Sequence, residues 1–196
     1  MDSPLPEPIT TTPRLIIRPL HPQDAPSMQL HASPASIAKY MTLAFPHPYT
    51  LDDARNWISR NTTHPLNSFT ICLRTAPTIA IGGISLKPGE DVETHIAEVA
   101  FWVGEPYWGQ GITTEALKAV TEWVFRERGE RYRRLWARVC SGNWGSMRCF
   151  EKCGYRLEGV LKGHVEKHGE VRDVHIYGLT KRDWEGIVEN REQGKD

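Results

Sequence analysis

The sequence has no excess charge of either sign, only four cysteines and no long apolar run. Its 196 residues contain 24 basic and 24 acidic side chains, so no overall field would draw the chain to nucleic acid or to a membrane. No run approaches the length of a membrane-spanning helix, and residues 1–12 are proline-rich and acidic, unlike a basic-then-apolar signal sequence. We therefore expect one soluble, cytoplasmic domain without a nucleic-acid or membrane partner.

The four cysteines do not form a recognisable metal site. Cys149 and Cys153 would share one face of a helix, but a zinc site needs two more suitably spaced ligands, and none is evident. Free cysteine behaves as a small hydrophobic residue. We therefore interpret Cys72, Cys140 and this pair as ordinary thiols and expect no metal.

The stretch from residue 97 to residue 119 organises the chain. It begins with an apolar run that contains one carboxylate, Glu98, passes through a glycine-rich turn at residues 104–111, and enters a helix near Ile112. Apolar residues in that helix recur with the spacing of a buried stripe, at Ala116, Ala119, Val120, Trp123 and Val124. A helix start reached from glycines offers backbone N–H groups and the positive end of the helix dipole to an anion. The stretch therefore predicts a phosphate or pyrophosphate site.

Other interpretations of these residues are less specific. Glycines after a strand can simply make a tight turn. No Lys-Ser or Lys-Thr follows Gly111, which excludes the common nucleoside-triphosphate loop, and residues 109–111 lack the third glycine of a dinucleotide fingerprint. The basic segment at residues 126–134 alternates in charge, which favours a solvated helix end over an RNA-binding patch.

Several motifs along the chain resemble the GNAT N-acetyltransferase superfamily, and most of all its RimJ/RimL-like branch. The matching segments are Thr12-Pro13-Arg14-Leu15 with Arg18-Pro19-Leu20, Ala97-Glu98-Val99-Ala100-Phe101, Tyr107 through Leu117, Asn143-Trp144-Gly145-Ser146, and Glu151-Lys152-Cys153-Gly154-Tyr155 with Glu158-Gly159. The likeness spans roughly residues 10 to 182. Together the motifs are specific to the superfamily, but they say little about the acceptor.

The resemblance implies the GNAT acyl-CoA N-acyltransferase fold, a mixed α/β architecture. Its central, mostly antiparallel, twisted sheet has a splayed strand pair and helices on both faces. On this chain the domain would occupy residues 11–184, between a disordered tail at residues 1–10 and a polar tail at residues 185–196. Acetyl-CoA would be the co-substrate, held by Phe101, Trp102, Val103, Gly109, Gln110, Gly111, Ile112, Thr113, Thr114, Asn143 and Ser146. The resemblance implies that its pyrophosphate lies on the amides of residues 109–114 and that a backbone N–H near residues 101–103 holds the thioester carbonyl oxygen.

Two positions depart from the superfamily's glycine motif, which Gln or Arg normally opens and a small residue closes. Trp108 stands at the first position, as is common in the RimJ/RimL-like branch, and Thr113 stands at the last. The methyl and hydroxyl groups of Thr113 must fit where a small residue normally admits the pyrophosphate. Thr113 is therefore expected to weaken the affinity for acetyl-CoA.

Glu98 is the candidate general base. Along residues 95–103, alternate side chains fall on opposite faces of a strand, and both faces are apolar apart from this carboxylate. A buried carboxylate has the raised pKa that a base needs, although a structural carboxylate that anchors a loop or a water chain is an equally good interpretation. The resemblance also places the base of many family members at this position.

Asn143 is expected to cap a helix that Gly154 ends, with Met147 and Phe150 facing inward. In the resembling family the equivalent asparagine also contacts the pantetheine arm of the cofactor. Ser146 matches a position that in some relatives gives a proton to the leaving thiolate. Local capping explains a serine there equally well.

Further patterns bear on the fold and on the acceptor. The Gly82-Gly83 pair inside a strand predicts a bulge or a close backbone approach, and residues 162–170 are predicted as a polar connection between the last two strands. In the resembling family, the region equivalent to residues 34–50 walls the acceptor site. Three polar side chains of the last strand could bind the acceptor, supply an acid or form an exposed sheet face: Asp173, His175 and Tyr177.

The implied reaction is acetyl transfer from acetyl-CoA to a primary amine, on a protein N-terminus or on a small molecule. A lysine-like amine has a pKa of about 10.4 and must lose a proton before it attacks the thioester, so a general base is needed. One alternative is a non-catalytic acyl-CoA-binding or partner-binding module on the same fold. Another is an RNA- or ribosome-associated protein, which the neutral charge balance disfavours. A monomer or a homodimer is expected.

Overall fold

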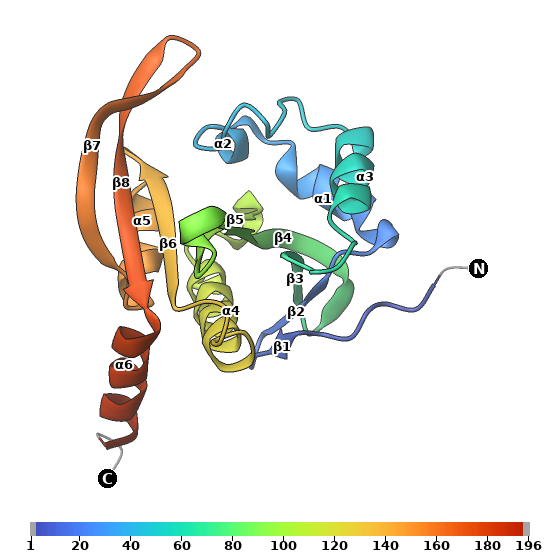
Figure 1. Cartoon of the computed structure of the whole chain (residues 1–196). Coiled ribbons are helices and arrows are strands. Elements are labelled where there is room, and N and C mark those ends of the chain that lie inside the picture. The colour runs from blue at the N-terminus through green and yellow to red at the C-terminus, as the bar shows by residue number, and fades with distance from the viewer. Residues whose placement is uncertain (1–2, 194–196) are drawn as a thin grey trace. The chain divides into compact units, whose positions relative to one another are not determined.

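The structure is a computed structural model that describes residues 3–193. The chain divides into two compact units. The first comprises residues 1–86 and 100–120, and the second comprises residues 87–99 and 121–196. Strand β5 (Ile96–Val103) and helix α4 (Ile112–Glu127) contribute residues to both units (Figure 1). The chain is thus a mixed α/β protein, as the sequence predicts.

The first unit contains antiparallel strands in the order β1–β2–β3–β4. These strands are β1 (Thr10–Thr11), β2 (Leu15–Pro19), β3 (Ser68–Leu73) and β4 (Ala76–Pro88). The helices of this unit are η1 (Pro22–Asp24), α1 (Ala25–Ala32), α2 (Ala35–Ala38), α3 (Leu51–Arg60) and η3 (Glu105–Tyr107). The predicted acceptor region, residues 34–50, therefore contains α2 and the loop that leads into α3.

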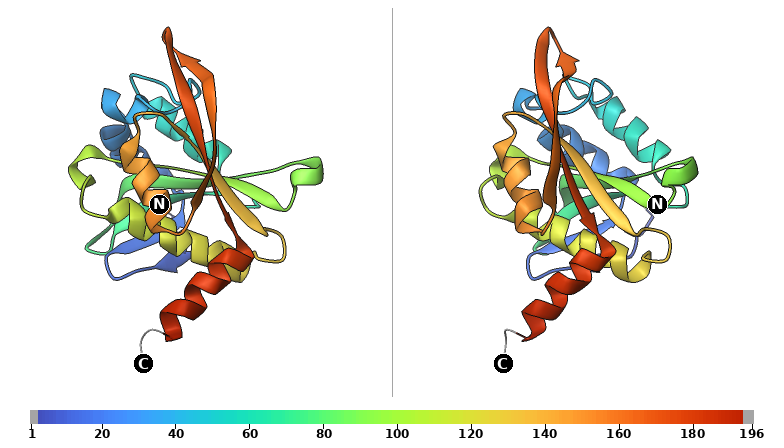
Figure 2. Two further views of the ribbon diagram at one scale, coloured as in Figure 1. Left: turned by 90° about the vertical axis from the view of Figure 1, so that its left-hand side faces the viewer. Right: turned by 60° about the vertical axis from the view of Figure 1, so that its left-hand side comes forward.

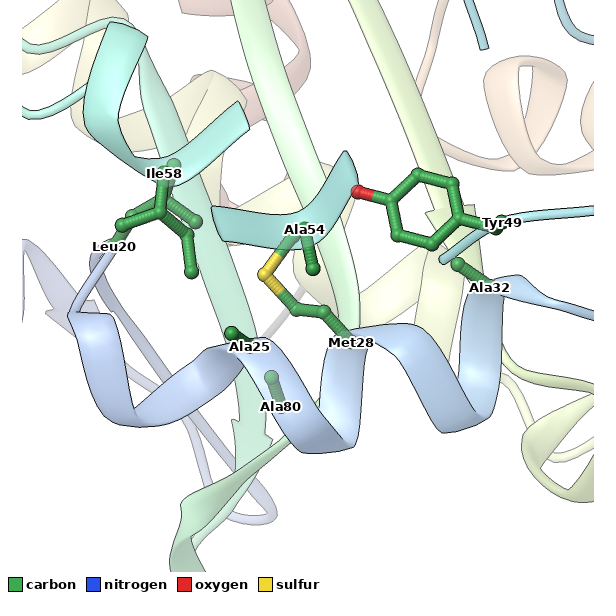
Figure 3. Packing of buried hydrophobic residues seen from close by; sticks show 8 residues of the cluster. All are labelled: Leu20, Ala25, Met28, Ala32, Tyr49, Ala54, Ile58 and Ala80. Atoms are coloured by element: carbon green, nitrogen blue, oxygen red, sulfur yellow. The ribbon is translucent and has the colours of Figure 1, made fainter. Parts of the chain in front are cut away.

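A cluster of buried side chains joins α1 and α3 to β4 (Figure 3). Its members are Leu20, Ala25, Met28, Ala32, Tyr49, Ala54, Ile58 and Ala80. Full burial of one large apolar side chain contributes about 1.5–3 kcal/mol. Because Ala32 and Tyr49 both belong to the cluster, the two ends of the predicted acceptor region are anchored in the core.

The Gly82-Gly83 pair in β4 has both features that the sequence predicts. The register between β3 and β4 shifts after Ile71, which lies opposite Gly82. A Cβ added to Gly82 would lie 2.5 Å from the carbonyl oxygen of Trp102 in β5. The bulge and the close backbone approach are therefore both confirmed.

The second unit contains strands in the order β5–β6–β8–β7. β5 and β6 are parallel, and the other pairs are antiparallel. The elements that follow β5 in this unit are β6 (Arg134–Cys140), α5 (Trp144–Lys152), β7 (Arg156–Lys167), β8 (Glu170–Thr180) and α6 (Lys181–Gln193), and η2 (Asp91–Glu93) precedes it. The predicted, mostly antiparallel sheet is confirmed.

The polar connection predicted at residues 162–170 is wrong. β7 continues to Lys167 and β8 begins at Glu170, so His168 and Gly169 alone connect them in a long hairpin (Figures 1 and 2). Both connecting residues have positive φ, 53° and 78°, as a two-residue hairpin turn requires. Most side chains near the turn are exposed on both faces, so the segment lacks the apolar alternation by which a strand is recognised.

The chain ends are more regular than the two predicted tails. A final short helix is expected from the sequence to begin at residues 180–184, and helix α6 begins at Lys181, where Thr180 caps it by accepting from the Asp183 N–H at 3.1 Å, and runs on to Gln193. Trp184 also packs on Phe125, with ring centroids 5.5 Å apart. At the other end, β1 begins at Thr10, inside the tail predicted for residues 1–10. Residues 1–2 and 194–196 lie outside the described residues.

The buried stripe of α4 is rotated relative to the predicted one. Ala116, Val120 and Val124 are buried as predicted, whereas Ala119 and Trp123 are only half-buried. The remaining buried residues of this helix are Ile112, Leu117, Thr121 and Phe125. Apolar residues flank the predicted stripe on both sides, so its spacing alone could not tell which flank is covered.

Candidate functional site

The glycine turn leads from β5 into α4, as predicted. Gly109 and Gly111 have φ angles of 72° and 75°, a left-handed backbone that glycine adopts without steric cost. A Cβ at Gly109 would meet nothing within 4 Å, so the backbone angle, and not lack of space, requires glycine there. The indole N–H of Trp108 donates to the carbonyl oxygen of Val103 at 2.6 Å. This bond closes the turn onto the end of β5.

Helix α4 starts at Ile112, as predicted, and the Glu115 N–H donates to the Gly111 carbonyl oxygen at 3.0 Å. The N–H groups of the first helical turn have no carbonyl partner within a helix and carry the positive end of its dipole. The turn at residues 109–111 is exposed, while residues 113–114 are half-buried. An exposed turn before a helix start can accept an anion such as a diphosphate.

A segment just before β2 contacts this helix start, which the sequence did not indicate. Glu115 accepts from Thr12 Oγ1 at 2.5 Å and from Arg14 Nε at 2.6 Å. Arg14 also donates from Nη1 to the carbonyl oxygen of Gln110 at 2.9 Å. Burial alone would raise the pKa of Glu115, but the hydrogen bonds from Thr12 and Arg14 outweigh it and lower that pKa. The helix start and the glycine turn are thus tied to the beginning of the chain.

The end of β5 carries the residues predicted to hold the thioester carbonyl. Val103 is buried, and Phe101 and Trp102 are half-buried. The next residue, Gly104, donates its N–H to the Ile81 carbonyl oxygen of β4 at 2.9 Å. A backbone donor to a thioester oxygen in this stretch remains a prediction.

Glu98 lies in the second unit, and its surroundings differ from the prediction. It is opposite Trp136 in the last of three registered β5–β6 pairs. Its side chain is 14% exposed, and Arg138 donates to both carboxylate oxygens, from Nε at 2.9 Å and from Nη2 at 3.3 Å. The predicted lone acid among apolar side chains is therefore wrong. Arg138 follows Trp136 by two residues on the same face of β6, and this brings a cation to Glu98.

Asn143 caps α5, as predicted. Its Oδ1 accepts from the Ser146 N–H at 3.3 Å. Met147 and Phe150 are buried, and Gly154, with a φ of 92°, follows the helix. The capping role is confirmed, whereas the pantetheine contact of Asn143 and the proton transfer by Ser146 stay predictions.

Two of the three polar residues of the last strand, Asp173 and Tyr177, form hydrogen bonds within the second unit. Asp173 accepts from Lys162 at 2.8 Å across the hairpin. Tyr177 is buried and donates to Glu151 at 3.0 Å, and burial raises the pKa of its hydroxyl to about 12. Among the described residues, the buried Nδ1 of His175 has no hydrogen-bond partner. Because Tyr177 is buried, the interpretation of this face as an exposed sheet surface is wrong there.

Residues 3–193 contain no group of three or more His, Cys, Asp or Glu side chains arranged to hold a metal ion. All four cysteines are thiols. The helices in this range are too short or too polar to span a membrane.

The predicted site residues belong to both units. The first unit carries residues 101–103 and 109–114, and the second carries Glu98, Asn143 and Ser146. The mostly antiparallel strands, the parallel β5–β6 pair and the glycine turn that opens a helix are features of the acyltransferase fold that the sequence predicts.

Comparison with known proteins identifies the family. Residues 14–156 match the acetyltransferase (GNAT) domain. The chain is 29% identical over 177 residues to the uncharacterized N-acetyltransferase YnaD of Bacillus subtilis (strain 168), with 89% of this chain and 98% of the relative covered. The chain therefore belongs to the GNAT family and is an acetyltransferase.

Solved structures agree on the fold. A GNAT-family acetyltransferase from Bacillus anthracis superposes with a TM-score of 0.77 at 24% identity, covering 88% of this chain and 98% of that one. RimL, a ribosomal L7/L12 alpha-N-protein acetyltransferase in complex with coenzyme A, superposes with a TM-score of 0.74 at 20% identity and covers 89% and 98%. These likenesses support the GNAT acyltransferase fold.

Proposed function

We propose that the protein transfers the acetyl group of acetyl-CoA to a primary amine, on a protein N-terminus or on a small molecule. The observation that carries this proposal is the exposed glycine turn that opens α4 in a chain of the GNAT family. A structural neighbour, RimL, is in complex with coenzyme A. The motifs described above favour the RimJ/RimL-like branch of the family.

The proposed acetyl-CoA contacts begin with the pyrophosphate. The backbone amides of residues 109–114 would bind it, because the two left-handed glycines and the helix start present N–H groups to an anion. A backbone N–H within residues 101–103 would donate to the thioester carbonyl oxygen, and Asn143 would contact the pantetheine arm. A donor aimed at developing negative charge is typically worth about 3 kcal/mol.

The proposed reaction is a direct attack. The ammonium form of the acceptor first loses one proton to the base, and the neutral amine nitrogen then attacks the thioester carbonyl carbon. The nitrogen loses a second proton as the carbon–sulfur bond breaks. The departing thiolate of coenzyme A takes up a proton. The products are an acetylated amine and free coenzyme A, and no covalent enzyme intermediate forms.

Glu98 is the proposed base, and Ser146 is the proposed donor to the thiolate. Two charge-assisted hydrogen bonds from Arg138 fix the orientation of the Glu98 carboxylate. Glu98 is also partly accessible, at 14% exposure, so an amine or one bridging water can reach it. Arg138 is thus proposed to position the base.

We further propose that the protein works in the cytoplasm as a monomer or a homodimer. Four thiols in one chain fit a reducing compartment. Residues 34–50, which contain α2 and the loop after it, are proposed to wall the acceptor site, as the resemblance to the family implies.

The test combines binding and turnover. Calorimetry with acetyl-CoA should show binding at or below millimolar concentration, and a thiol assay should show coenzyme A release that depends on an added amine. Peptides with free N-termini, N-terminally blocked peptides and small primary amines would be compared as acceptors. Absence of acetyl-CoA binding at millimolar concentration would contradict the proposal, and binding without coenzyme A release with any amine would contradict its catalytic part.

A further inference from the structure

The first turn of α4 is held by residues about a hundred positions earlier in the chain, all within the first unit. Glu115 accepts from Thr12 Oγ1, from the Arg14 backbone N–H at 3.2 Å and from Arg14 Nε at 2.6 Å. Both oxygens of one carboxylate are therefore bound by a segment outside the glycine motif. Several hydrogen bonds to one carboxylate therefore attach the helix start to residues 12–14.

Arg14 also reaches the glycine turn itself. Its Nη1 donates to the Gln110 carbonyl oxygen at 2.9 Å. Its Nη2 lies 2.6 Å from Glu115 Oε2 and 3.5 Å from where a Cβ on Gly111 would stand. The Arg14 side chain is 48% exposed. A guanidinium has five N–H donors, so Arg14 can hold the turn and the helix start and still donate to a ligand beside them.

The glycine turn and the first turns of α4 carry negative charge only, so a cation from elsewhere in the chain matters there. Residues 104–117 contain two carboxylates, Glu105 and Glu115, and no lysine or arginine. Glu115 suits the helix dipole, but its charge would repel a diphosphate at the same helix start. Arg14 lies against this carboxylate and can offset that repulsion.

We propose that Arg14 is a pyrophosphate-binding residue of the acetyl-CoA site, with Glu115 as the residue that positions it. This inference rests on the proposed function. Arg14 supplies the positive charge that the segment from Gly104 to Leu117 lacks, and the superfamily position where Gln or Arg opens the glycine motif is occupied here by Trp108. The bond from Arg14 to Gln110 also holds the turn in the conformation that receives the phosphates.

The test compares two ligands that differ in the pyrophosphate. Binding of acetyl-CoA and of S-acetylpantetheine, which lacks the nucleotide and its pyrophosphate, would be measured by calorimetry for the wild type, R14A and R14K. R14A should weaken acetyl-CoA binding by about tenfold or more and leave S-acetylpantetheine binding unchanged. R14K should recover part of the loss, because lysine keeps the charge but cannot bridge Glu115 and Gln110.

The matched control is R55A, which removes an exposed arginine of the same unit that pairs with Asp52. It should bind both ligands like the wild type. In turnover, R14A should raise the KM for acetyl-CoA and leave kcat nearly unchanged.

Unchanged acetyl-CoA binding in R14A, or an equal loss for both ligands, would overturn the inference. If R14A does not fold, R14K carries the same test, with weaker acetyl-CoA binding and unchanged S-acetylpantetheine binding as the expected result. A wild type that binds neither ligand would instead overturn the proposed function and this inference with it.

Discussion

Arg138 donates to both oxygens of the Glu98 carboxylate, from Nε at 2.9 Å and from Nη2 at 3.3 Å. A side-on pair of this kind fixes the plane of the carboxylate as well as its position. The Arg138 side chain is 45% exposed, so the pair is accessible to solvent on one side. Glu98 is therefore a held and partly accessible acid, and a role in proton transfer can be tested by substitution.

The first prediction concerns this pair. E98Q keeps the size of the side chain and removes the base, so kcat should fall by about a hundredfold or more. The loss should be concentrated on the limb of the pH profile where the rate rises with pH, while the KM for acetyl-CoA changes little. Steady-state kinetics across the pH range would measure both effects.

A matched control for E98Q is E158Q, which removes the carboxylate of another ion pair in the second unit, that of Glu158 with Arg134. Its rate profile should match the wild type. R138A should lower kcat less than E98Q, because it frees the base without removing it. A pH profile of E98Q identical to that of the wild type would exclude Glu98 as the base.

The second prediction separates the two roles of Asn143. N143A removes the side chain that caps α5 and should lower the free energy of unfolding by about 1 kcal/mol. N143S, which retains a capping oxygen, should recover most of that stability. Acetyl-CoA binding should remain weaker than wild type in both variants if Asn143 contacts the pantetheine arm. Wild-type affinity in N143S would limit Asn143 to capping.

The third prediction concerns Gly82. An added Cβ there would lie 2.5 Å from the Trp102 carbonyl oxygen and 2.9 Å from Val103 Cγ2, so G82A must push two strands apart and should cost about 1–3 kcal/mol. Chemical denaturation would measure the loss. G159A is the control, because a Cβ at Gly159 in β7 would meet nothing within 4 Å. Equal stabilities of the two variants would contradict the close approach.

The fourth prediction concerns the stability of the folded protein at low pH. Hydrogen bonds from Thr12 and Arg14 outweigh burial and lower the pKa of Glu115 in the folded state. A lowered pKa contributes stability that is fully present above the unfolded value, about 4.3, and is lost as the pH falls through the folded value. Wild type should therefore exceed E115Q in stability at neutral pH, and the difference should shrink below about pH 4.3. A difference that stays constant from neutral pH into this acid range would contradict the prediction.

Local features of the fold could be predicted from the sequence because their signals lie close together in the chain. The start of α4 at Ile112 follows from glycines directly before it. The cap of α5 follows from Asn143 and from a helix that begins at the next residue. Each signal lies within a few residues of the structure that it predicts.

Contacts between distant segments could not be predicted in this way. The pairing of Glu98 with Arg138 depends on β5 and β6 being parallel neighbours with Glu98 opposite Trp136. The contact of Arg14 with Glu115 joins positions 101 residues apart. Charged residues among apolar ones, Glu98 in β5 and Arg138 in β6, are the signal that could have suggested the first pair. Arg14 lies in a segment that resembles the family, but nothing in the sequence pairs it with Glu115.

The hairpin of β7 and β8 bears on how the protein behaves in concentrated solution. β7 is the last strand in the strand order, and a long, flat, apolar strand in that place would be a template for aggregation. Its register with β8 shifts twice, between Leu157 and Gly159 and between Leu161 and Val165, and lysines at positions 162 and 167 add charge. Irregular register and charge both oppose pairing of this edge with a strand of another molecule, although Leu157, Leu161 and Val171 of the hairpin are exposed.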